Sequence, residues 1–275
     1  MTPIALITDF GLQDAYVGIM KGVIMAIAPT VSCLDLTHMV PPQDIRAAQF
    51  HLITAYPYLP SGTVYLIVVD PGVGSDRRAI AVRFPWGTVV CPDNGILTGL
   101  LGRHPSEQLQ AVTLTQPAYW RSHHGTAVPQ VSATFHGRDI FAPVAAHLAR
   151  GTPLMQVGTP TLVSSLVQLP DLLLPEQATS GVIQYIDHFG NLISTIPAAA
   201  AHDSWVAVIG DGPVGPARGP RAIPSGKTYS SVAPGQLVAL VGSHGWIEIA
   251  AHGGRASDML QGTIGQPVAI RHTKV

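Results

Sequence analysis

The feature of this sequence that most constrains its fold is the alternation, through the first half, of short apolar runs with longer amphipathic stretches. The runs at residues 4–8 and 64–69 are rich in Val, Ile and Leu and lack the polar alternation of a half-exposed strand. Continuous runs of this kind are typical of strands covered on both faces. The pattern therefore predicts an α/β domain with a largely parallel sheet covered by helices.

We expect the strands of this domain at residues 4–8, 32–36, 64–69, 79–84, 88–91 and 111–114, and its helices at residues 14–28, 44–55, 95–102 and 139–149. From residue 151 to about residue 180, repeated prolines favour an extended connector over any regular element. The expected organisation is an N-terminal α/β catalytic domain at 1–165, the connector at 166–180 and a smaller C-terminal domain at 181–275.

The C-terminal part shows short strand-like runs separated by turn residues, at 182–186, 192–196, 205–209, 237–241, 246–250 and 268–271. Several short strands at this spacing predict a compact β-barrel or sandwich.

Charge and hydropathy narrow the class of partner. Only 11% of the 275 residues are charged, the formal net charge is −1, and Lys and Arg form no run. The sequence therefore lacks the cluster of basic residues with which a protein binds nucleic acid or an anionic membrane, and a small-molecule partner is favoured. The longest apolar stretches are shorter than the roughly 18 residues of a membrane-spanning helix. The first residues lack a secretion-like pattern, so the expected location is the cytoplasm.

The sequence gives little indication of a metal or redox site. Cys33 and Cys91 lie in apolar contexts without a CxxC spacing, which is typical of buried, reduced thiols. The twelve histidines follow no HExxH or HxH pattern, and His123 and His124 are expected in a polar loop.

Polar residues follow two of the predicted strands. Asp9, in the segment TDFG, comes directly after the first strand, and Asp70 begins the segment DPGVG after the third. Ligands of open α/β sheets bind outside the carboxyl ends of strands, so Asp9 is a candidate to accept both hydroxyls of a ribose. The structural alternatives are a helix cap or turn for Asp9 and an ordinary turn for Asp70. The presence of Arg77 a few residues later favours a functional role for Asp70, because a guanidinium beside the acid would keep it ionised and oriented.

Two further clusters lie later in the chain. In TFHGRDIF, His136 precedes a helix, whose dipole favours a neutral imidazole, and Arg138 and Asp139 are expected to cap or to pair. The segments IDHFGN and GSHGWIE place polar groups in turns between strands, which hairpin turns alone explain. The amide, carboxylate and hydroxyl groups of these segments would also hydrogen-bond a purine that stacks on Phe189 or Tyr229, and would bind an amino acid.

Six segments together resemble the signature motifs of the S-adenosylmethionine hydroxide adenosyltransferases, a family related to the fluorinase and chlorinase: ITDFG, VVDPGVGSDRR, CPDNG, TFHGRDIFAP, IDHFGN and GSHGWIEIA. They occur in the same order over nearly the whole chain. The resemblance implies an α/β domain, a C-terminal β-barrel and a homotrimer with active sites between the N-terminal domain of one subunit and the C-terminal domain of the next. The implied reaction is hydrolysis of S-adenosyl-L-methionine at C5′ to adenosine and L-methionine, without a metal or other cofactor.

The resemblance also implies the site residues. The set that prepares the water corresponds to Asp70, Arg77 and His136. The substrate-binding positions correspond to Asp9, Asp14, Asp187, Phe189, Asn191, Tyr229, Ser243, His244, Glu248 and Ala251.

Within that set, the resemblance implies that Asp9 holds the ribose diol and that Asn191 and Tyr229 hold the adenine. Ser243 and Glu248 would complete the nucleoside pocket.

The methionine end is the less defined part of the implied site. Its candidates are Asp14, Asp187 and His244. Relatives often have a second serine or an arginine where this chain has His244.

The nucleophile can be judged from a loop length. Only residues 85–87 separate two predicted strands, so the long insertion typical of the fluorinase is missing, and DPGVG followed by Arg77 is the hydrolase-like form. Water is therefore favoured over halide. The alternatives are a halide-using enzyme of the same family and a non-catalytic sensor of adenosine or S-adenosylmethionine. The sequence leaves open which sulfonium epimer is the substrate and which group takes the proton.

Overall fold

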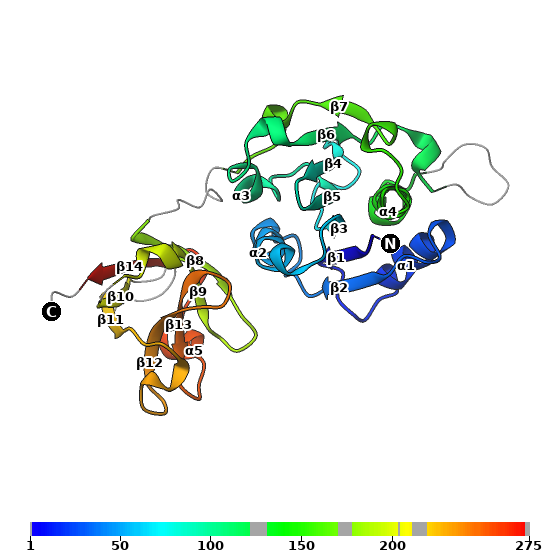
Figure 1. Ribbon diagram of the computed structural model, residues 1–275. Coiled ribbons are helices and arrows are strands. Elements are labelled where there is room, and N and C mark those ends of the chain that lie inside the picture. The colour runs from blue at the N-terminus through cyan, green and yellow to red at the C-terminus, as the bar shows by residue number, and fades with distance from the viewer. Residues whose placement is uncertain (1, 122–130, 170–177, 203, 211–218, 273–275) are drawn as a thin grey trace. The chain divides into compact units, whose positions relative to one another are not determined.

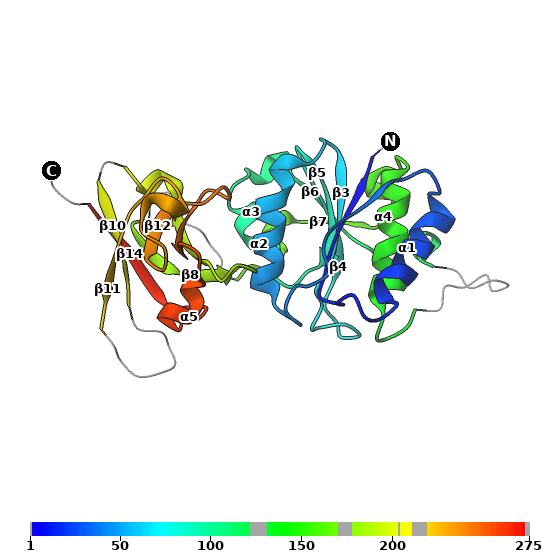
Figure 2. The same cartoon turned by 90° about the horizontal axis from the view of Figure 1, so that it is seen from below.

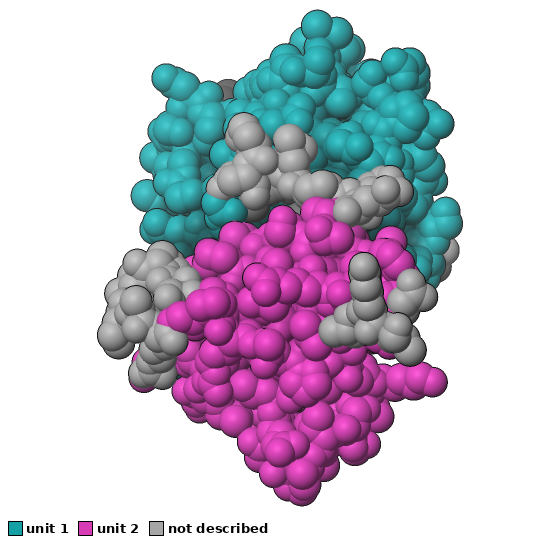
Figure 3. Space-filling model, turned by 90° about the vertical axis from the view of Figure 1, so that its left-hand side faces the viewer, with its two compact units in different colours: residues 1–173 teal, residues 174–275 magenta. Residues whose placement is uncertain are grey.

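The computed structural model describes residues 2–121, 131–169, 178–202, 204–210 and 219–272 (Figure 1). The chain forms two compact units, residues 1–173 and residues 174–275 (Figure 3). No helix in the described ranges is long and apolar enough to cross a membrane.

Unit 1 is built on a seven-stranded sheet of order β2-β1-β3-β5-β4-β6-β7. Its strands and α-helices are β1 (Ile4–Thr8), α1 (Tyr16–Ile27), β2 (Cys33–Thr37), α2 (Ile45–Ala55), β3 (Thr63–Val68), β4 (Ala79–Phe84), β5 (Gly87–Pro92), α3 (Thr98–Leu101), β6 (Gln110–Thr113), α4 (Ala142–Ala149) and β7 (Thr159–Thr161). Strands β2, β1, β3 and β5 pair in parallel, whereas β4, β6 and β7 join antiparallel. The predicted α/β class is confirmed, with a mixed sheet.

Helices cover both faces of this sheet, which explains its continuous apolar strands. Figure 2 shows α1 and α4 on one face and α2 and α3 on the other. Every residue of β1 and β3 is buried. Met20 and Ile24 of α1 and Phe141 before α4 join the same core. Because β1 and β3 are parallel neighbours, their carboxyl ends meet at one edge of this covered sheet.

The proline-rich stretch after residue 151 contains a strand that the sequence analysis did not predict. Residues Thr159–Thr161 form β7, which pairs antiparallel with β6. Pro160 is tolerated because β7 lies at the edge of the sheet, where a missing amide hydrogen breaks no second ladder. The interpretation of residues 151–180 as connector throughout was wrong.

Unit 2 is a seven-stranded sheet of order β11-β10-β14-β8-β9-β13-β12, with every strand pair antiparallel. Its elements are β8 (Ser180–Ile186), β9 (Leu192–Pro197), β10 (Trp205–Ile209), β11 (Arg221–Pro224), β12 (Leu237–Val241), β13 (Trp246–Ala251), α5 (Ala256–Leu260) and β14 (Pro267–His272). A bridge joins Ser225, which directly follows the outer strand β11, to Ala239 in the middle of the other outer strand, β12. The sheet is thus nearly closed and barrel-like, as predicted.

Two elements of unit 2 were missed. Strand β11 has one buried residue, Ile223, and ends in a proline, so its apolar signal is weak. Helix α5 has five residues, too few to show a helical period.

The stability of unit 1 should depend on His51 in α2. Burial lowers the pKa of His51 to about 4, and the charge of Asp44 at the start of the helix only partly opposes this. In the unfolded chain the pKa is about 6.5, so between these two values the unfolded state binds a proton that the folded state does not. Stability is therefore complete above about pH 6.5 and is lost as the pH falls toward about 4.

We expect His51→Gln to remove about 2 kcal/mol of the loss in unfolding free energy that the wild type shows between about pH 7 and about pH 5. Urea unfolding of both proteins at the two pH values measures this difference. Parallel pH dependence in wild type and variant would contradict it.

Candidate active site

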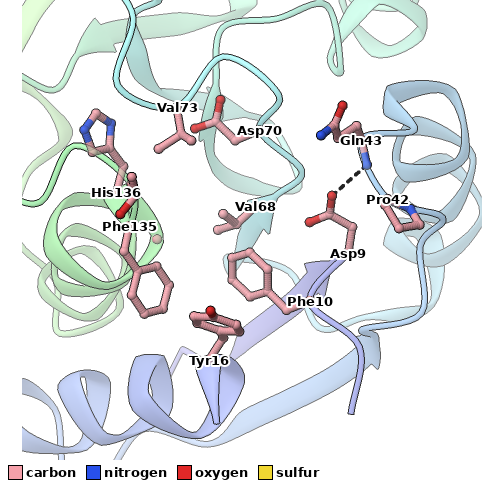
Figure 4. Close-up of a pocket in the computed structure, with 12 residues that line it drawn as sticks. Asp9, Phe10, Tyr16, Pro42, Gln43, Val68, Asp70, Val73, Phe135 and His136 are labelled. Carbon is pink, nitrogen blue, oxygen red and sulfur yellow. Dashed lines mark hydrogen bonds between the residues drawn. The ribbon is translucent and has the colours of Figure 1, made fainter. Parts of the chain in front are cut away.

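A cavity of about 300 Å³ in unit 1 lies at the carboxyl ends of β1 and β3 (Figure 4). It is bounded by these strand ends, the loop before α2 and the segment before α4. Its lining residues are Asp9, Phe10, Tyr16, Pro42, Gln43, Val68, Asp70, Val73, Thr134, Phe135, His136 and Gly137. Three predicted site residues, Asp9, Asp70 and His136, thus share one cavity.

Asp9 directly follows β1 and is held by a distant segment. Its Oδ2 accepts a hydrogen bond of 2.8 Å from the backbone N–H of Gln43, shown dashed in Figure 4. Gln43 has a φ of 65°, a backbone conformation that this bond helps to stabilise. The helix-cap alternative does not apply, because α1 begins after Ala15.

Arg77 connects the two other acid–base groups of the cavity. Its Nε and Nη2 donate to the two carboxylate oxygens of Asp70 at 2.9 and 2.5 Å, in the bidentate geometry of a strong pair. Its Nη2 also lies 2.7 Å from Nδ1 of His136. The guanidinium carbon lies 5.2 Å from the ring centre of Phe141. Arg77 itself does not line the cavity, so it joins Asp70 and His136 from behind.

The arrangement determines the protonation state of His136. A guanidinium can only donate, so Nδ1 must accept, and the neutral ring carries its proton on Nε2. Burial lowers the pKa of His136, and the charge of Arg77 lowers it further, against the opposing charges of Asp70 and Asp139. Burial and the charge of Arg77 therefore favour the neutral imidazole that the sequence predicted from a helix dipole.

The segment that carries His136 is tied to a buried carboxylate. His136 precedes a π-helical turn, Gly137–Phe141, rather than the first turn of an α-helix. Asp139 is fully buried and accepts from Arg138 Nε and Nη2, both at 2.7 Å, and from Ser132 N at 2.9 Å. Burial opposes ionisation of Asp139, yet these hydrogen bonds and the charge of Arg138 hold its pKa below the ordinary value. The predicted pairing of Arg138 with Asp139 is confirmed.

Close packing holds the DPGVG loop beside the His136 segment. Gly74 has a φ of 79°, and a Cβ at this position would lie 2.3 Å from the carbonyl oxygen of Ala133. Only glycine accepts both the left-handed conformation and this approach. The two loops that carry Asp70 and His136 are therefore in direct contact.

A second cavity, of about 460 Å³, lies in unit 2 and is lined by Phe189, Asn191, Tyr229, Ala251, Gly253 and Gly254. The first four of these are predicted substrate-binding residues. Phe189 and Tyr229 are 70% and 45% exposed, which is unusual for large aromatic side chains. Exposed aromatic faces beside a polar amide form a surface suited to a planar heterocycle.

Asp187 fixes the orientation of the Asn191 amide. The Asp187 carboxylate accepts from the backbone N of Asn191 at 2.8 Å and from its Nδ2 at 2.9 Å. Because a carboxylate only accepts, Nδ2 must face Asp187. The Oδ1 atom and the second Nδ2 hydrogen of Asn191 remain to recognise a ligand.

Glu248 lies behind the second cavity. It is 3% exposed, and its two oxygens lie 2.9 Å from the hydroxyl of Tyr229 and 3.1 Å from Nε2 of His244. Burial and the Glu248 charge raise the pKa of Tyr229 to about 12. Glu248 and His244 thus support the pocket without lining it.

Arg77, Asp187 and Glu248 contact residues that line a cavity, and His244 contacts Glu248, whereas the two remaining predicted residues lie apart from both cavities. Asp14 is exposed ahead of α1, and Ser243 is exposed in the turn before β13. His123 and His124 lie outside the described residues, and within the described part no group of three or more His, Cys, Asp or Glu side chains could hold a metal ion.

The structure adds residues that the sequence analysis missed. The rings of Phe10, Tyr16 and Phe135 lie within 5.2 to 5.8 Å of one another and form one wall of the first cavity (Figure 4). Buried His38 lies 2.9 Å from Thr8 Oγ1 and braces the turn that presents Asp9. Phe10 and Phe135 lie within the motifs TDFG and TFHGRD, and this position was the available signal.

Comparison with known proteins agrees with these motifs. Models of the SAM hydroxide adenosyltransferase N-terminal and C-terminal domains match residues 4–158 and residues 181–269. The chain is 39% identical to the (R)-S-adenosyl-L-methionine hydrolase of Thermus thermophilus, over 98% of this chain and 100% of that protein. It is also 39% identical to the protein of the same name from Salinispora tropica, over 97% of each chain. The fluorinase of Actinopolyspora mzabensis is 28% identical over 70% of this chain and 71% of its own length.

Solved structures give the same assignment of fold. A conserved protein from Thermotoga maritima superposes with a TM-score of 0.85 at 33% identity, covering 98% of this chain and 100% of its own. One from Thermus thermophilus gives 0.80 at 38% identity with the same coverage. With both family domains matched in order, and with full-length relatives well above 30% identity, the chain belongs to the SAM hydroxide adenosyltransferase family.

Proposed function

We propose that this protein hydrolyses S-adenosyl-L-methionine by attack of water at C5′, releasing adenosine and L-methionine. The observation that carries the proposal is the contact of Asp70, Arg77 and His136 at the end of β3, with the acid and the imidazole lining one cavity. The names of the full-length relatives support the (R)-sulfonium epimer as substrate.

In this reaction only the attacking water needs to be activated by the protein. The water oxygen forms a bond to C5′ while the C5′–S bond breaks. The electron pair of the C5′–S bond stays on sulfur, which leaves as the neutral thioether of methionine. No general acid, metal or redox cofactor is needed. Because hydroxide character and sulfonium charge cancel as they react, a site that excludes bulk water favours the transition state.

Asp70 is the proposed acceptor of the water proton. His136 holds its proton on Nε2 and accepts from Arg77 at Nδ1, so it can donate to the water oxygen but has no lone pair for the proton. The Asp70 carboxylate retains lone pairs beyond the two that Arg77 occupies. His136 then orients the water, Asp70 receives its proton, and Arg77 positions both.

The remaining groups suit the nucleoside. Asp9 keeps Oδ1 for the ribose hydroxyls while Oδ2 is held by Gln43. Asn191, with Oδ1 and one N–H directed away from Asp187, can bind the amino group and a ring nitrogen of adenine together. A 6-oxo purine would present an acceptor to Oδ1 and should bind more weakly.

Two alternative functions are less well supported. A halide brings no proton, so the carboxylate of Asp70 would repel it rather than activate it. The fluorinase match is also lower in identity and coverage than the hydrolase matches above. A sensor would need Asp9 and Asn191 but not the joined set of acid, guanidinium and imidazole.

The proposal extends to assembly and location. We infer a homotrimer, as the family resemblance implies, in which Asp70, Arg77 and His136 of one subunit work with the adenine-binding residues of another. The division of these two groups of residues between different compact units is consistent with such a shared site. Both cysteines are free, which is consistent with the proposed cytoplasmic location.

The first prediction concerns the nucleophile. In isotopically labelled water the heavy oxygen should appear at the 5′ position of the adenosine product, because water forms the new bond. Mass spectrometry of the product, with and without chloride, measures this. Recovery of 5′-chloroadenosine as the main product would overturn the choice of water, and absence of any turnover would favour the sensor.

The second prediction separates catalysis from binding. Asp70→Asn and His136→Ala should lower kcat by about a hundredfold or more, because each acts on the attacking water. Asp9→Ala and Asn191→Ala should mainly weaken adenosine binding. Asp76→Ala, an exposed acid on the same loop, is the control. Folded Asp70→Asn protein with wild-type turnover would contradict the catalytic role proposed for Asp70, Arg77 and His136.

The third prediction concerns assembly. Activity per chain should fall on dilution in step with loss of the oligomer, measured by turnover and by light scattering at matched concentrations. A monomer with full activity at nanomolar concentration is incompatible with a shared site.

A further inference from the structure

We propose, resting on the function above, that His244 is a positioning residue that fixes the Tyr229 ring through Glu248, and so sets affinity for the adenosine moiety rather than the rate of the reaction. The resemblance suggests a different role, contact with the methionine end. The hydrogen bonds of the ring argue for positioning.

A directed chain of hydrogen bonds joins the three side chains. The backbone N–H of Trp246 donates to His244 Nδ1 at 3.2 Å, so the His244 proton resides on Nε2. Nε2 then donates to Glu248 Oε2 at 3.1 Å. The hydroxyl of Tyr229 donates to Glu248 Oε1 at 2.9 Å. Both nitrogens of His244 are used within the protein, which leaves neither directed at a substrate carboxylate.

Because these side chains are buried, loss of one hydrogen-bonding partner should disturb the others. The side chains of Glu248 and His244 are only 4% and 13% exposed. A buried carboxylate that loses a hydrogen-bond partner either moves toward water or stays at high cost. If Glu248 moves, the Tyr229 hydroxyl loses its anchor.

Gly242 provides an independent sign that the position of the His244 ring is built in. A Cβ on Gly242 would lie 2.4 Å from both Cε1 and Nε2 of His244 and 2.7 Å from Glu248 Oε2. The φ of Gly242 is not in the left-handed region, so a Cβ here would displace the His244 and Glu248 side chains rather than strain the backbone. The imidazole lies directly over this glycine, which lets it reach Glu248.

The anchored ring forms a wall of the second cavity. Tyr229 lines it together with Phe189 and Asn191 and is 45% exposed, so its ring is free to rotate unless its hydroxyl is held. A wall already held in place loses less rotational freedom when a purine stacks on it. The groups that change during the reaction lie in unit 1, so the effect should fall on binding.

The test compares four variants with the wild type in steady-state turnover and in calorimetric titration with adenosine. His244→Ala should raise KM and the adenosine Kd about tenfold while kcat changes less than about twofold. His244→Gln, whose amide nitrogen can reach Glu248, should restore most of the affinity. Gly242→Ala should weaken adenosine binding like His244→Ala, although it removes no polar group. His272→Ala, an exposed histidine of the same unit, is the control.

The outcomes separate this inference from the proposed function. Wild-type protein that binds adenosine but releases none from S-adenosylmethionine contradicts the hydrolase, and the titrations still test the positioning role. Unchanged adenosine affinity in folded His244→Ala, or a fall in kcat at constant KM, overturns the role of His244. Failure of His244→Gln to restore affinity also overturns it.

Discussion

The contact of Arg77 with both Asp70 and His136 is the interaction on which the site in unit 1 depends. Asp70 and Arg77 are 6% and 10% exposed at their side chains, so each charge needs the other. Removing one partner of such a buried pair leaves an uncompensated charge, which is strongly destabilising. The same guanidinium fixes the tautomer of His136 and so, in the proposed reaction, leaves Asp70 as the group that takes the proton from water.

The backbone around this pair is arranged to keep it in place. The β1 and β3 ends are rigid because both faces of the sheet are covered, whereas the segment with His136 has an irregular π-helical entry. Its fixed point is the buried carboxylate of Asp139, satisfied by Arg138 and by a backbone amide. π-Helical turns are common at functional sites, where they redirect a side chain that a regular helix would turn away.

The two cavities use buried carboxylates in different ways. Asp70 is paired with a cation and lines the first cavity, where the proposed reaction needs a proton acceptor. Glu248 is held by two neutral donors, Tyr229 and His244, and stays behind the second cavity. Glu248 accepts hydrogen bonds from both of its partners and so orients the Tyr229 ring, whereas Asp70 forms a bidentate pair with a guanidinium. This difference matches the division between catalysis and binding proposed for the two units.

Local pattern and motifs were enough to predict the α/β class, the barrel-like second half and the family. They also identified Asp9, Asp70, Arg77 and His136 as candidate site residues. The sequence could not predict β7 or α5, whose short segments carry no clear period and form through long-range pairing or packing. It could not reveal the aromatic wall of the first cavity or the support of His38, since these residues meet only when distant segments fold together. Tertiary structure alone decided the His136 tautomer and the inward position of His244. Both depend on which donor lies opposite a ring nitrogen, and residue spacing does not contain that information.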